Sequence, residues 1–284
     1  MNLQYRINFV PANLIFPQSY EKFLIQTTAE ASKASAVLNE FNLAVEDRTE
    51  PGRVNKTTSI CITDIWELWN NSEGQFTFLG PRNKPPVTFH IVQEFTDGIV
   101  YGDFSGKGQS DTYAFEGIEI VIFTNWLANF SDVILHAAGI AVDGKGFAFV
   151  GSSGVGKSTL SEALAKEPGV TMLGEDQVVL RYLDEQFWIF GTPWHERPEL
   201  CSPIGVPLTK VFFLERTDGE QFERLSPIEG VKRLLQTAFI PYYRSGKLPG
   251  ILNRLTMLAE EVPFYRLRYQ IGSKVLPEIL ALNL

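Results

Sequence analysis

The sequence contains few of the residues that bind metals or form disulfides. Among its 284 residues there are two cysteines and three histidines. Cys61 and Cys201 lie far apart in the chain, and neither belongs to a Cys-x-x-Cys or Cys/His cluster. The pattern therefore predicts neither a zinc site nor a disulfide framework, and we interpret both cysteines as small, buried, apolar residues.

Positive charge is not concentrated anywhere in the chain. The 25 Lys and Arg residues are scattered among 33 Asp and Glu residues, and the formal net charge is −8. Binding to a nucleic-acid backbone or to an anionic membrane requires a cluster or stripe of basic side chains. We therefore expect no nucleic acid and no membrane among the partners of this protein.

Long apolar runs are also lacking. No segment reaches the roughly eighteen uninterrupted apolar residues that a membrane-spanning helix needs. Residues 1–18 form an apolar stretch that is broken by proline and has no small-residue cleavage site of the kind that ends a signal peptide. These features predict a cytoplasmic protein. The hydrophobic fraction of 44% is nevertheless sufficient for a packed core.

The first 130 residues have the pattern of a mainly β region. Short runs rich in β-branched and aromatic residues alternate with Asn, Ser, Gly and Pro clusters, and they lie at 4–11, 59–69, 74–80, 87–95 and 98–104. Apolar spacing predicts one helix over about 20–41. Segment 118–130 is apolar almost all round, which favours a buried helix and leaves a strand as the alternative. We place a domain boundary near Phe130 and expect residues 1–130 to be an α+β region that binds a partner or regulates.

Residues 131–284 have the alternating pattern of an α/β domain. Asp143-Gly144 and Asp184-Glu185 each join two apolar runs and predict hairpin turns. Ser226, followed by Pro227 and by Glu229 three residues after it, predicts a helix start. The further expected elements are helices over 156–166, 227–239 and 250–261, strands over 170–176, 209–216 and 263–271, and a short helix at the C-terminus.

Between a strand and a helix lies the glycine-rich segment 151–158, GSSGVGKS, which fits the pattern GxxxxGK[ST]. Its glycines allow successive N–H groups to point at a phosphate, and the helix that follows adds its free N–H groups and the positive end of its dipole. Lys157 would reach the β- and γ-phosphates, and the Ser158 hydroxyl would bind Mg²⁺. The expected nucleotide-binding residues are Gly151, Ser152, Ser153, Gly154, Val155, Gly156, Lys157, Ser158 and Thr159, and the expected cofactors are ATP and Mg²⁺. The alternative is a glycine turn that only packs a strand on a helix, with Lys157 in solvent.

Acidic and basic residues at two strand ends supply the other groups that phosphoryl transfer needs. Glu175 and Asp176 follow the strand after the loop helix, where one acid could bind Mg²⁺ and the other accept a proton. The residues themselves leave open which acid has which role. Further on, GTPWHERPE brings a second carboxylate, Glu196, and a fixed cation, Arg197, close to a strand end. We expect Glu196 to serve the metal and Arg197 to be catalytic.

Residues 134–164 together with LGED at 173–176 resemble the bacterial HPr kinase/phosphorylase family, whose catalytic domain belongs with the phosphoenolpyruvate carboxykinase-like P-loop folds. The family has a histidine fifteen residues before the first glycine of its loop, and His136 precedes Gly151 by the same interval (151 − 136). The resemblance implies an α/β kinase domain with a central mixed sheet, which transfers a phosphoryl group from a nucleotide to a serine or threonine hydroxyl of a protein or peptide.

The resemblance also implies roles for individual residues. Lys157 would hold the donor phosphates, and Ser158 and Asp176 would serve the metal. Glu175 stands where the family has a proton-accepting aspartate, and His136 would lie beside the transferred group. The family's members form hexamers, so a homo-oligomer is compatible with the resemblance, although no pattern in this chain requires one.

The chain departs from the family in several ways. The acidic pair is Glu-Asp and not Asp-Asp, one extra residue separates it from the loop, and the family's glycine-arginine signature is missing. The N-terminal region does not match the family's regulatory domain, and the remaining segments look like those of diverged HPr-kinase-related bacterial proteins, some of which modify small peptides. Two alternatives therefore stay open: a small-molecule or carboxykinase-like phosphotransferase, and a nucleotide-binding regulator or peptide-maturation partner that transfers no phosphate.

Overall fold

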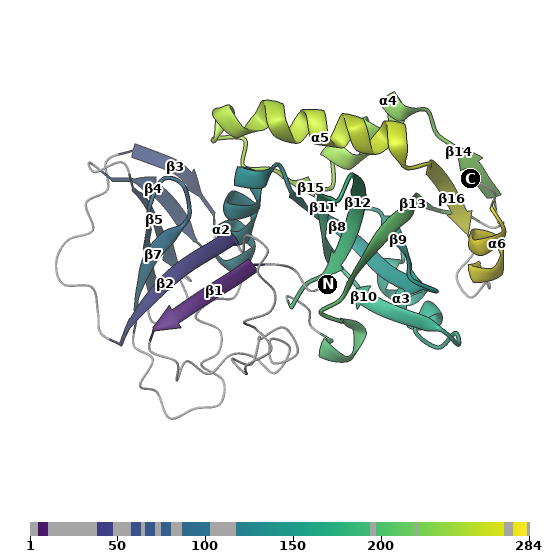
Figure 1. The fold of residues 1–284 in the computed structure, drawn as a ribbon, viewed down its shortest axis with the longest axis horizontal. Helices are drawn as coiled ribbons and strands as arrows, with labels where there is room; N and C mark the ends of the chain where they lie inside the picture. The colour runs from purple at the N-terminus through teal and green to yellow at the C-terminus, as the bar shows by residue number, and fades with distance from the viewer. Residues whose placement is uncertain are drawn as a thin grey trace. The chain divides into compact units, whose positions relative to one another are not determined.

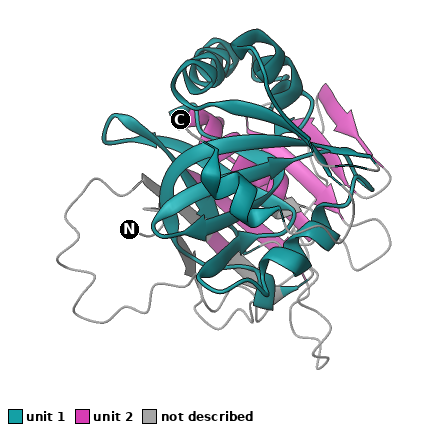
Figure 2. Cartoon of the chain, turned by 90° about the vertical axis from the view of Figure 1, so that its right-hand side faces the viewer, with its two compact units in different colours: residues 1–3, 18–24, 130–284 teal, residues 4–17, 25–129 magenta. Residues whose placement is uncertain are grey.

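The structure is a computed structural model that describes residues 5–10, 39–47, 58–63, 66–71, 75–80, 87–102, 118–193, 197–217, 219, 221–269 and 275–282. The chain forms two compact units (Figures 1 and 2). The described residues up to Asn129 belong to one unit, and those from Phe130 onward belong to the other.

The first unit contains a seven-stranded sheet with the strand order β1-β2-β7-β6-β5-β4-β3. Its strands are β1 Tyr5–Val10, β2 Asn39–Asp47, β3 Thr58–Ile62, β4 Glu67–Asn70, β5 Phe76–Gly80, β6 Val87–Ile91 and β7 Asp97–Gly102. The strands β1, β2 and β7 run parallel, and the pairs from β7 to β3 are antiparallel. A helix, α2 Ile118–Leu127, and the first two residues of a 3-10 turn, η3 Ala128–Phe130, complete the described part of this unit.

Three sequence predictions for this unit can be compared with the structure. The single strand expected over 59–69 is wrong, because the Thr63 side chain pairs with Trp66 in a turn that separates β3 from β4. Most of the helix expected over 20–41 lies outside the described residues, but its end is wrong, since β2 begins at Asn39. Segment 118–130 is confirmed as helical. Burial around this apolar helix outweighs the strand preference of its β-branched residues.

The second unit is an α/β unit built on a nine-stranded mixed sheet. The strand order is β10-β8-β11-β12-β13-β16-β14, with β9 paired to both β8 and β13 and with β15 paired to β8. The strands are β8 Val133–Val142, β9 Lys145–Val150, β10 Val170–Gly174, β11 Gln177–Leu183, β12 Gln186–Gly191, β13 Gly205–Arg216, β14 Gln221–Arg224, β15 Ala238–Phe239 and β16 Phe264–Tyr269. The helices are α3 Lys157–Leu164, α4 Pro227–Leu235, α5 Leu248–Glu261 and α6 Leu276–Ala281, with 3-10 turns η4 Pro198–Leu200 and η5 Ser245–Lys247.

The local signals in the sequence account for most of these elements. Asp143-Gly144 and Asp184-Glu185 form the expected two-residue turns with positive φ at both positions, as the favoured hairpin turns require. The Ser226 hydroxyl caps α4 by accepting a hydrogen bond from the Glu229 N–H at 3.3 Å. The helix ends at Leu235, earlier than expected, because residues 238–239 pair with β8 as β15.

The sheet of this unit has a long central strand, β13, and one of its faces is buried beneath α3. The strands β9, β13 and β16 run parallel to one another, and β8 is antiparallel to β9. Phe149 of β9 stacks on Phe212 of β13 with ring centroids 5.4 Å apart, and Leu160 and Leu164 of α3 pack into the same buried cluster. This packing fixes the start of α3 at the carboxyl end of β9.

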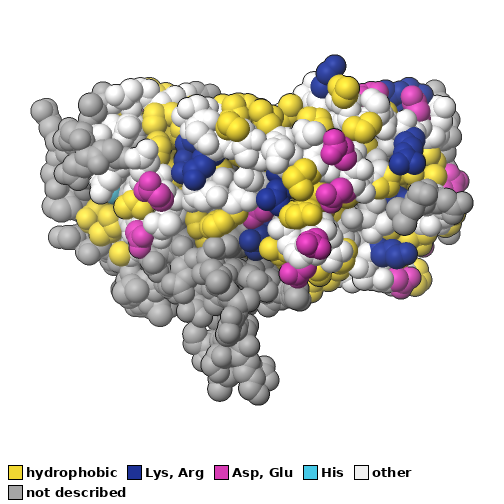
Figure 3. Space-filling model, turned by 45° about the horizontal axis from the view of Figure 1, so that its top comes forward, with side chains coloured by type: hydrophobic (Ala, Val, Ile, Leu, Met, Phe, Trp, Pro, Cys, Tyr) yellow, Lys and Arg dark blue, Asp and Glu magenta, His cyan; other side chains and the backbone are white. Residues whose placement is uncertain are grey.

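Charged residues are interspersed on the surface that Figure 3 shows, where Lys and Arg side chains lie among Asp and Glu side chains. In the described residues, no helix has both the length and the apolar character needed to cross a membrane.

Candidate functional site

The glycine loop connects the end of β9 at Val150 to the start of α3 at Lys157. Gly156 caps α3 with a φ of 107°, and Gly154 has a φ of 80°. A Cβ at Gly156 would also lie 2.5 Å from the hydroxyl oxygen of Tyr269. Both the backbone angle and the close approach therefore require glycine at position 156.

Lys157 is a buried cation inside this loop. Its side chain is 5% exposed, and Nζ donates hydrogen bonds to the backbone oxygens of Gly151 at 2.8 Å and Ser152 at 3.2 Å. Burial lowers the pKa of Lys157, and the nearby negative charge of Asp176 opposes that shift. The alternative in which Lys157 lies in solvent is therefore wrong: the ammonium group is held in the loop.

Tyr269, the last residue of β16, supports the loop from the neighbouring parallel strands. Its hydroxyl donates a hydrogen bond to the Gly156 carbonyl oxygen at 2.9 Å, and burial raises the pKa of Tyr269. Tyr269 is not among the site residues that the sequence predicts. The signal that could have found it is its place at the carboxyl end of a strand, where ligand sites of α/β sheets gather.

The strand β8 brings three separate segments of the chain together. Ala137 of β8 pairs with Val150, the last residue before the glycine loop. On the other edge of β8, Gly139 pairs with Gly174 and His136 pairs with Gln177, so the turn between β10 and β11 lies beside the same part of the strand. That turn consists of Glu175 and Asp176. The loop, the histidine and the acidic pair are therefore neighbours.

His136 and Asp176 interact directly. The distance between His136 Nε2 and Asp176 Oδ1 is 2.8 Å, and because a carboxylate only accepts, the histidine N–H is the donor. The pKa of Asp176 is lowered, chiefly by this hydrogen bond; burial opposes the shift, and the charges of His136 and Lys157 add to it. The two side chains are 28% and 49% exposed, so both can be reached from solvent.

Glu175, the other member of the acidic pair, is held by Arg197. The Glu175 side chain is 7% exposed, and Arg197 donates to its Oε2 atom from Nε at 2.8 Å and from a second guanidinium nitrogen. A third donor of Arg197 bonds Glu162 of α3. These hydrogen bonds raise the pKa of Arg197 above its ordinary value. Arg197 therefore joins the acidic turn to the helix that follows the glycine loop.

The structure thus brings most of the expected site residues together. His136, Glu175, Asp176 and Arg197 are linked through the contacts above, and Lys157 lies close enough for the charge of Asp176 to act on it. The loop residues Ser152, Ser153, Gly154, Ser158 and Thr159 are exposed. Gly151, Val155 and Gly156 are partly exposed. The remaining expected metal ligand, Glu196, lies outside the described residues. Sequence reasoning missed Glu162, because an exposed glutamate in a helix has no local signal that distinguishes it.

The donor groups of the loop suit a polyphosphate. The first N–H groups of α3 have no partner within the helix, and its N-cap residue is a glycine that makes no side-chain cap. These amides and the Lys157 ammonium can therefore bind an anion. For Mg²⁺, the Ser158 hydroxyl and the Asp176 carboxylate are suitable hard oxygen ligands. The described residues hold no cluster of three or more His, Cys, Asp or Glu side chains that could hold a metal ion.

No family model matches the chain, and no curated protein matches it either. Among solved structures, the chain is similar to the Hpr(Ser) kinase/phosphatase from Coxiella burnetii, with a TM-score of 0.28 and 13% sequence identity. The alignment covers 52% of this chain and 90% of that one.

Proposed function

We propose that this protein is an ATP-dependent phosphotransferase that moves the γ-phosphoryl group of ATP to a hydroxyl group. The observation that carries the proposal is that three groups lie side by side at β8. They are the glycine loop with the buried Lys157, the Asp176 carboxylate bonded by His136, and the Glu175 carboxylate bonded by Arg197. These are the groups that phosphoryl transfer requires: a phosphate cradle, a metal ligand and a proton acceptor.

The donor nucleotide binds at the loop and the start of α3. The free amides of α3 and the Lys157 ammonium group neutralise the phosphate oxygens. In the structure Lys157 bonds the carbonyl oxygens of Gly151 and Ser152. On nucleotide binding it exchanges these neutral acceptors for anionic oxygens, which gives stronger, charge-assisted hydrogen bonds.

Asp176 and Ser158 are the residues that would hold Mg²⁺, which would supply charge neutralisation on the transferred group. The lowered pKa of Asp176 supports the metal-ligand role for this residue of the acidic pair. A carboxyl whose pKa is lowered stays ionised at neutral pH and is a weak proton acceptor, but it remains a good anionic ligand. His136 donates to Asp176 and thereby fixes the direction of its carboxylate.

Glu175 accepts the proton of the attacking hydroxyl. Both hydrogen bonds from Arg197 reach Oε2 of Glu175, so its other oxygen is the atom that takes the proton. As the hydroxyl oxygen forms its bond to the γ-phosphorus, the bond from that phosphorus to the β–γ bridging oxygen breaks, and ADP leaves with the electron pair. Arg197 is the positioning residue that holds Glu175 during this step.

The acceptor class comes from the family resemblance and is a serine or threonine hydroxyl of a protein or peptide. The test is incubation of the purified protein with Mg²⁺ and γ-labelled ATP in a cell lysate, followed by mass spectrometry of labelled products. A labelled serine or threonine that the Lys157→Ala variant does not produce supports the proposal. A labelled small molecule points to the alternative phosphotransferase. ATP binding without any labelled product contradicts the proposal and favours a nucleotide-binding regulator.

The Glu175→Gln variant tests the role of Glu175. We expect it to bind Mg·ATP as the wild type does and to lose transfer, because a neutral amide cannot take the proton. Transfer at the wild-type rate would show that Glu175 is not the proton acceptor.

A further inference from the structure

Arg216 is the last residue of β13 and lies at the same edge of the sheet as the glycine loop. Phe213 of β13 pairs in parallel with Val150, so the strand continues past the point at which β9 ends and the loop begins. In the other direction Arg216 pairs with Tyr269 of β16. The residue therefore lies on β13, the strand that pairs with β9 on one side and with β16 on the other.

The side chain of Arg216 is on the face of the sheet that α3 covers. Side chains alternate along a strand, so Arg216 shares a face with Leu214. Leu214 belongs to the buried cluster that includes Leu160 of α3. The positive charge of Arg216 acts on Tyr269, whose hydroxyl bonds the Gly156 carbonyl at the start of α3. Arg216 thus lies near the N-terminal end of α3.

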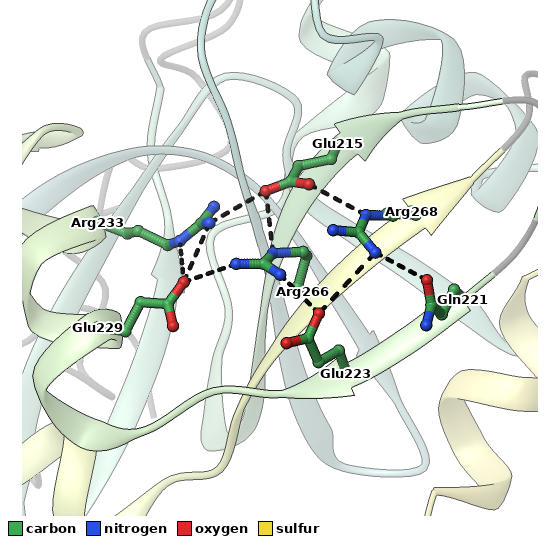
Figure 4. A network of polar contacts seen from close by, with 7 residues as sticks. All are labelled: Glu215, Gln221, Glu223, Glu229, Arg233, Arg266 and Arg268. Atoms are coloured by element: carbon green, nitrogen blue, oxygen red, sulfur yellow. Dashed lines mark hydrogen bonds and ion pairs between the residues drawn. The ribbon is translucent and has the colours of Figure 1, made fainter.

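Glu215, which precedes Arg216 in the chain, forms its ion pairs with other arginines. Glu215 points to the opposite face, where it forms ion pairs with arginines of α4 and β16 (Figure 4). Its carboxylate oxygens lie 3.0 Å from Arg233, 3.0 Å from Arg266 and 3.3 Å from Arg268. Arg216 itself is exposed, and no hydrogen bond or ion pair joins its side chain to another residue in the part of the chain that the structure describes.

The arrangement of the site gives a bound nucleotide a direction. In the proposed function, His136 and Asp176 lie where the γ-phosphoryl group is transferred. Both residues are on the β8 and β10 side of the loop. The strands β13 and β16 lie on the other side of β9. A triphosphate whose γ-phosphoryl faces Asp176 therefore extends its nucleoside end toward Arg216.

We infer that Arg216 is a second cation of the nucleotide site, which contacts the phosphate chain at its nucleoside end. The inference rests on the proposed function, since it needs a nucleotide in the loop. An exposed guanidinium without a partner can turn to an α-phosphate oxygen without breaking an existing contact, and its several donors suit a phosphate. Arg216 contributes to the affinity for any nucleotide with this group and takes no part in the transfer step.

The experiment compares Arg216→Gln with Arg224→Gln by calorimetric titration with Mg·ATP and Mg·ADP. Arg224 is an exposed arginine on β14 of the same sheet, paired with Tyr265 and not with Tyr269. We expect Arg216→Gln to weaken the binding of both nucleotides by about tenfold, the size of one charge-assisted hydrogen bond. Arg224→Gln should bind both nucleotides as the wild type does. In transfer assays, Arg216→Gln should raise KM for ATP and leave kcat unchanged.

Failure of this inference differs from failure of the proposed function. If the wild type binds neither nucleotide, the proposed function is wrong. If the wild type binds ATP, and Arg216→Gln binds it equally well or loses kcat without a change in KM, the inference about Arg216 is wrong and the proposed function stands. Far-ultraviolet circular dichroism and a melting curve confirm that each variant is folded.

Discussion

The Nε2 atom of His136 lies 2.8 Å from the Oδ1 atom of Asp176, although the two residues are 40 positions apart in the sequence. One residue is in the middle of β8, and the other is in the turn between two strands that pair with β8. The contact therefore depends on the strand register of the sheet, and it links the proposed metal ligand to β8, the strand that pairs with β9 beside the glycine loop.

The contact predicts a pH dependence of stability. The folded-state pKa of Asp176 lies below the ordinary value of 3.8, so the interaction stabilises the fold above that pH and is lost as the pH falls through the folded-state pKa. Because Asp176 is half exposed, we expect Asp176→Asn to lower the melting temperature by at most about 2 °C near neutral pH. The difference from wild type should vanish in acid. A difference that grows as the pH falls below 3.8 would contradict this assignment.

Substitution of Lys157 should affect nucleotide binding and folding stability in different ways. Lys157→Met removes the charge and keeps much of the apolar stem, so it relieves the cost of burying an ammonium group. We expect an unchanged or higher melting temperature together with a loss of Mg·ATP affinity of roughly a hundredfold or more. Lys166→Met, at an exposed position just beyond α3, should change neither property. Wild-type ATP affinity in Lys157→Met would remove the basis of the proposed function.

The requirement for glycine at position 156 can be tested by comparing its substitution with that of Gly144. Gly156→Ala combines a φ of 107° with a contact of 2.5 Å to the Tyr269 hydroxyl, whereas Gly144→Ala has a φ of 73° and open space around the new methyl group. We expect Gly144→Ala to cost about 1 kcal/mol in the free energy of unfolding and Gly156→Ala to cost about 2 to 4 kcal/mol. Urea denaturation measures both values. Equal costs would show that the Tyr269 contact does not constrain the loop.

The ion pair of Arg197 with Glu175 should contribute more to stability and activity than its ion pair with Glu162. Arg197→Gln leaves the buried carboxylate of Glu175 without its cation, and we expect a loss of about 1 to 3 kcal/mol in unfolding free energy and a fall in kcat. Glu162→Gln removes only an exposed partner, with an expected cost below about 0.5 kcal/mol. Chemical denaturation and transfer assays of both variants test this order, which the reverse result would contradict.

Sequence reasoning located the elements that depend on local chemistry. The two hairpin turns, the start of α4 at Ser226 and the strand and helix around the glycine loop follow from Gly, Asp and capping residues at fixed spacing. Short-range signals of this kind act within a few residues, so they can be recognised without the rest of the fold.

Contacts between distant segments could not be predicted in this way. The bond from Tyr269 to Gly156, the link from Arg197 to Glu162 and the position of Arg216 beside β16 all depend on strand order, which no local pattern encodes. The strand β2 was missed for a related reason. Its first residues continue an apolar spacing that also fits a helix, and pairing with β1 decides between the two.

The hairpin of β8 and β9 determines how far the histidine is from the loop along the chain. Ala137 and Val150 are opposite each other, so His136 and Gly151 are the next residues outward on the two strands. Lengthening one strand alone would shift that match and turn every later side chain of the strand to the opposite face. Related chains can therefore have a longer or shorter hairpin only if both strands change by the same number of residues. An interval of fourteen or sixteen residues would require a bulge.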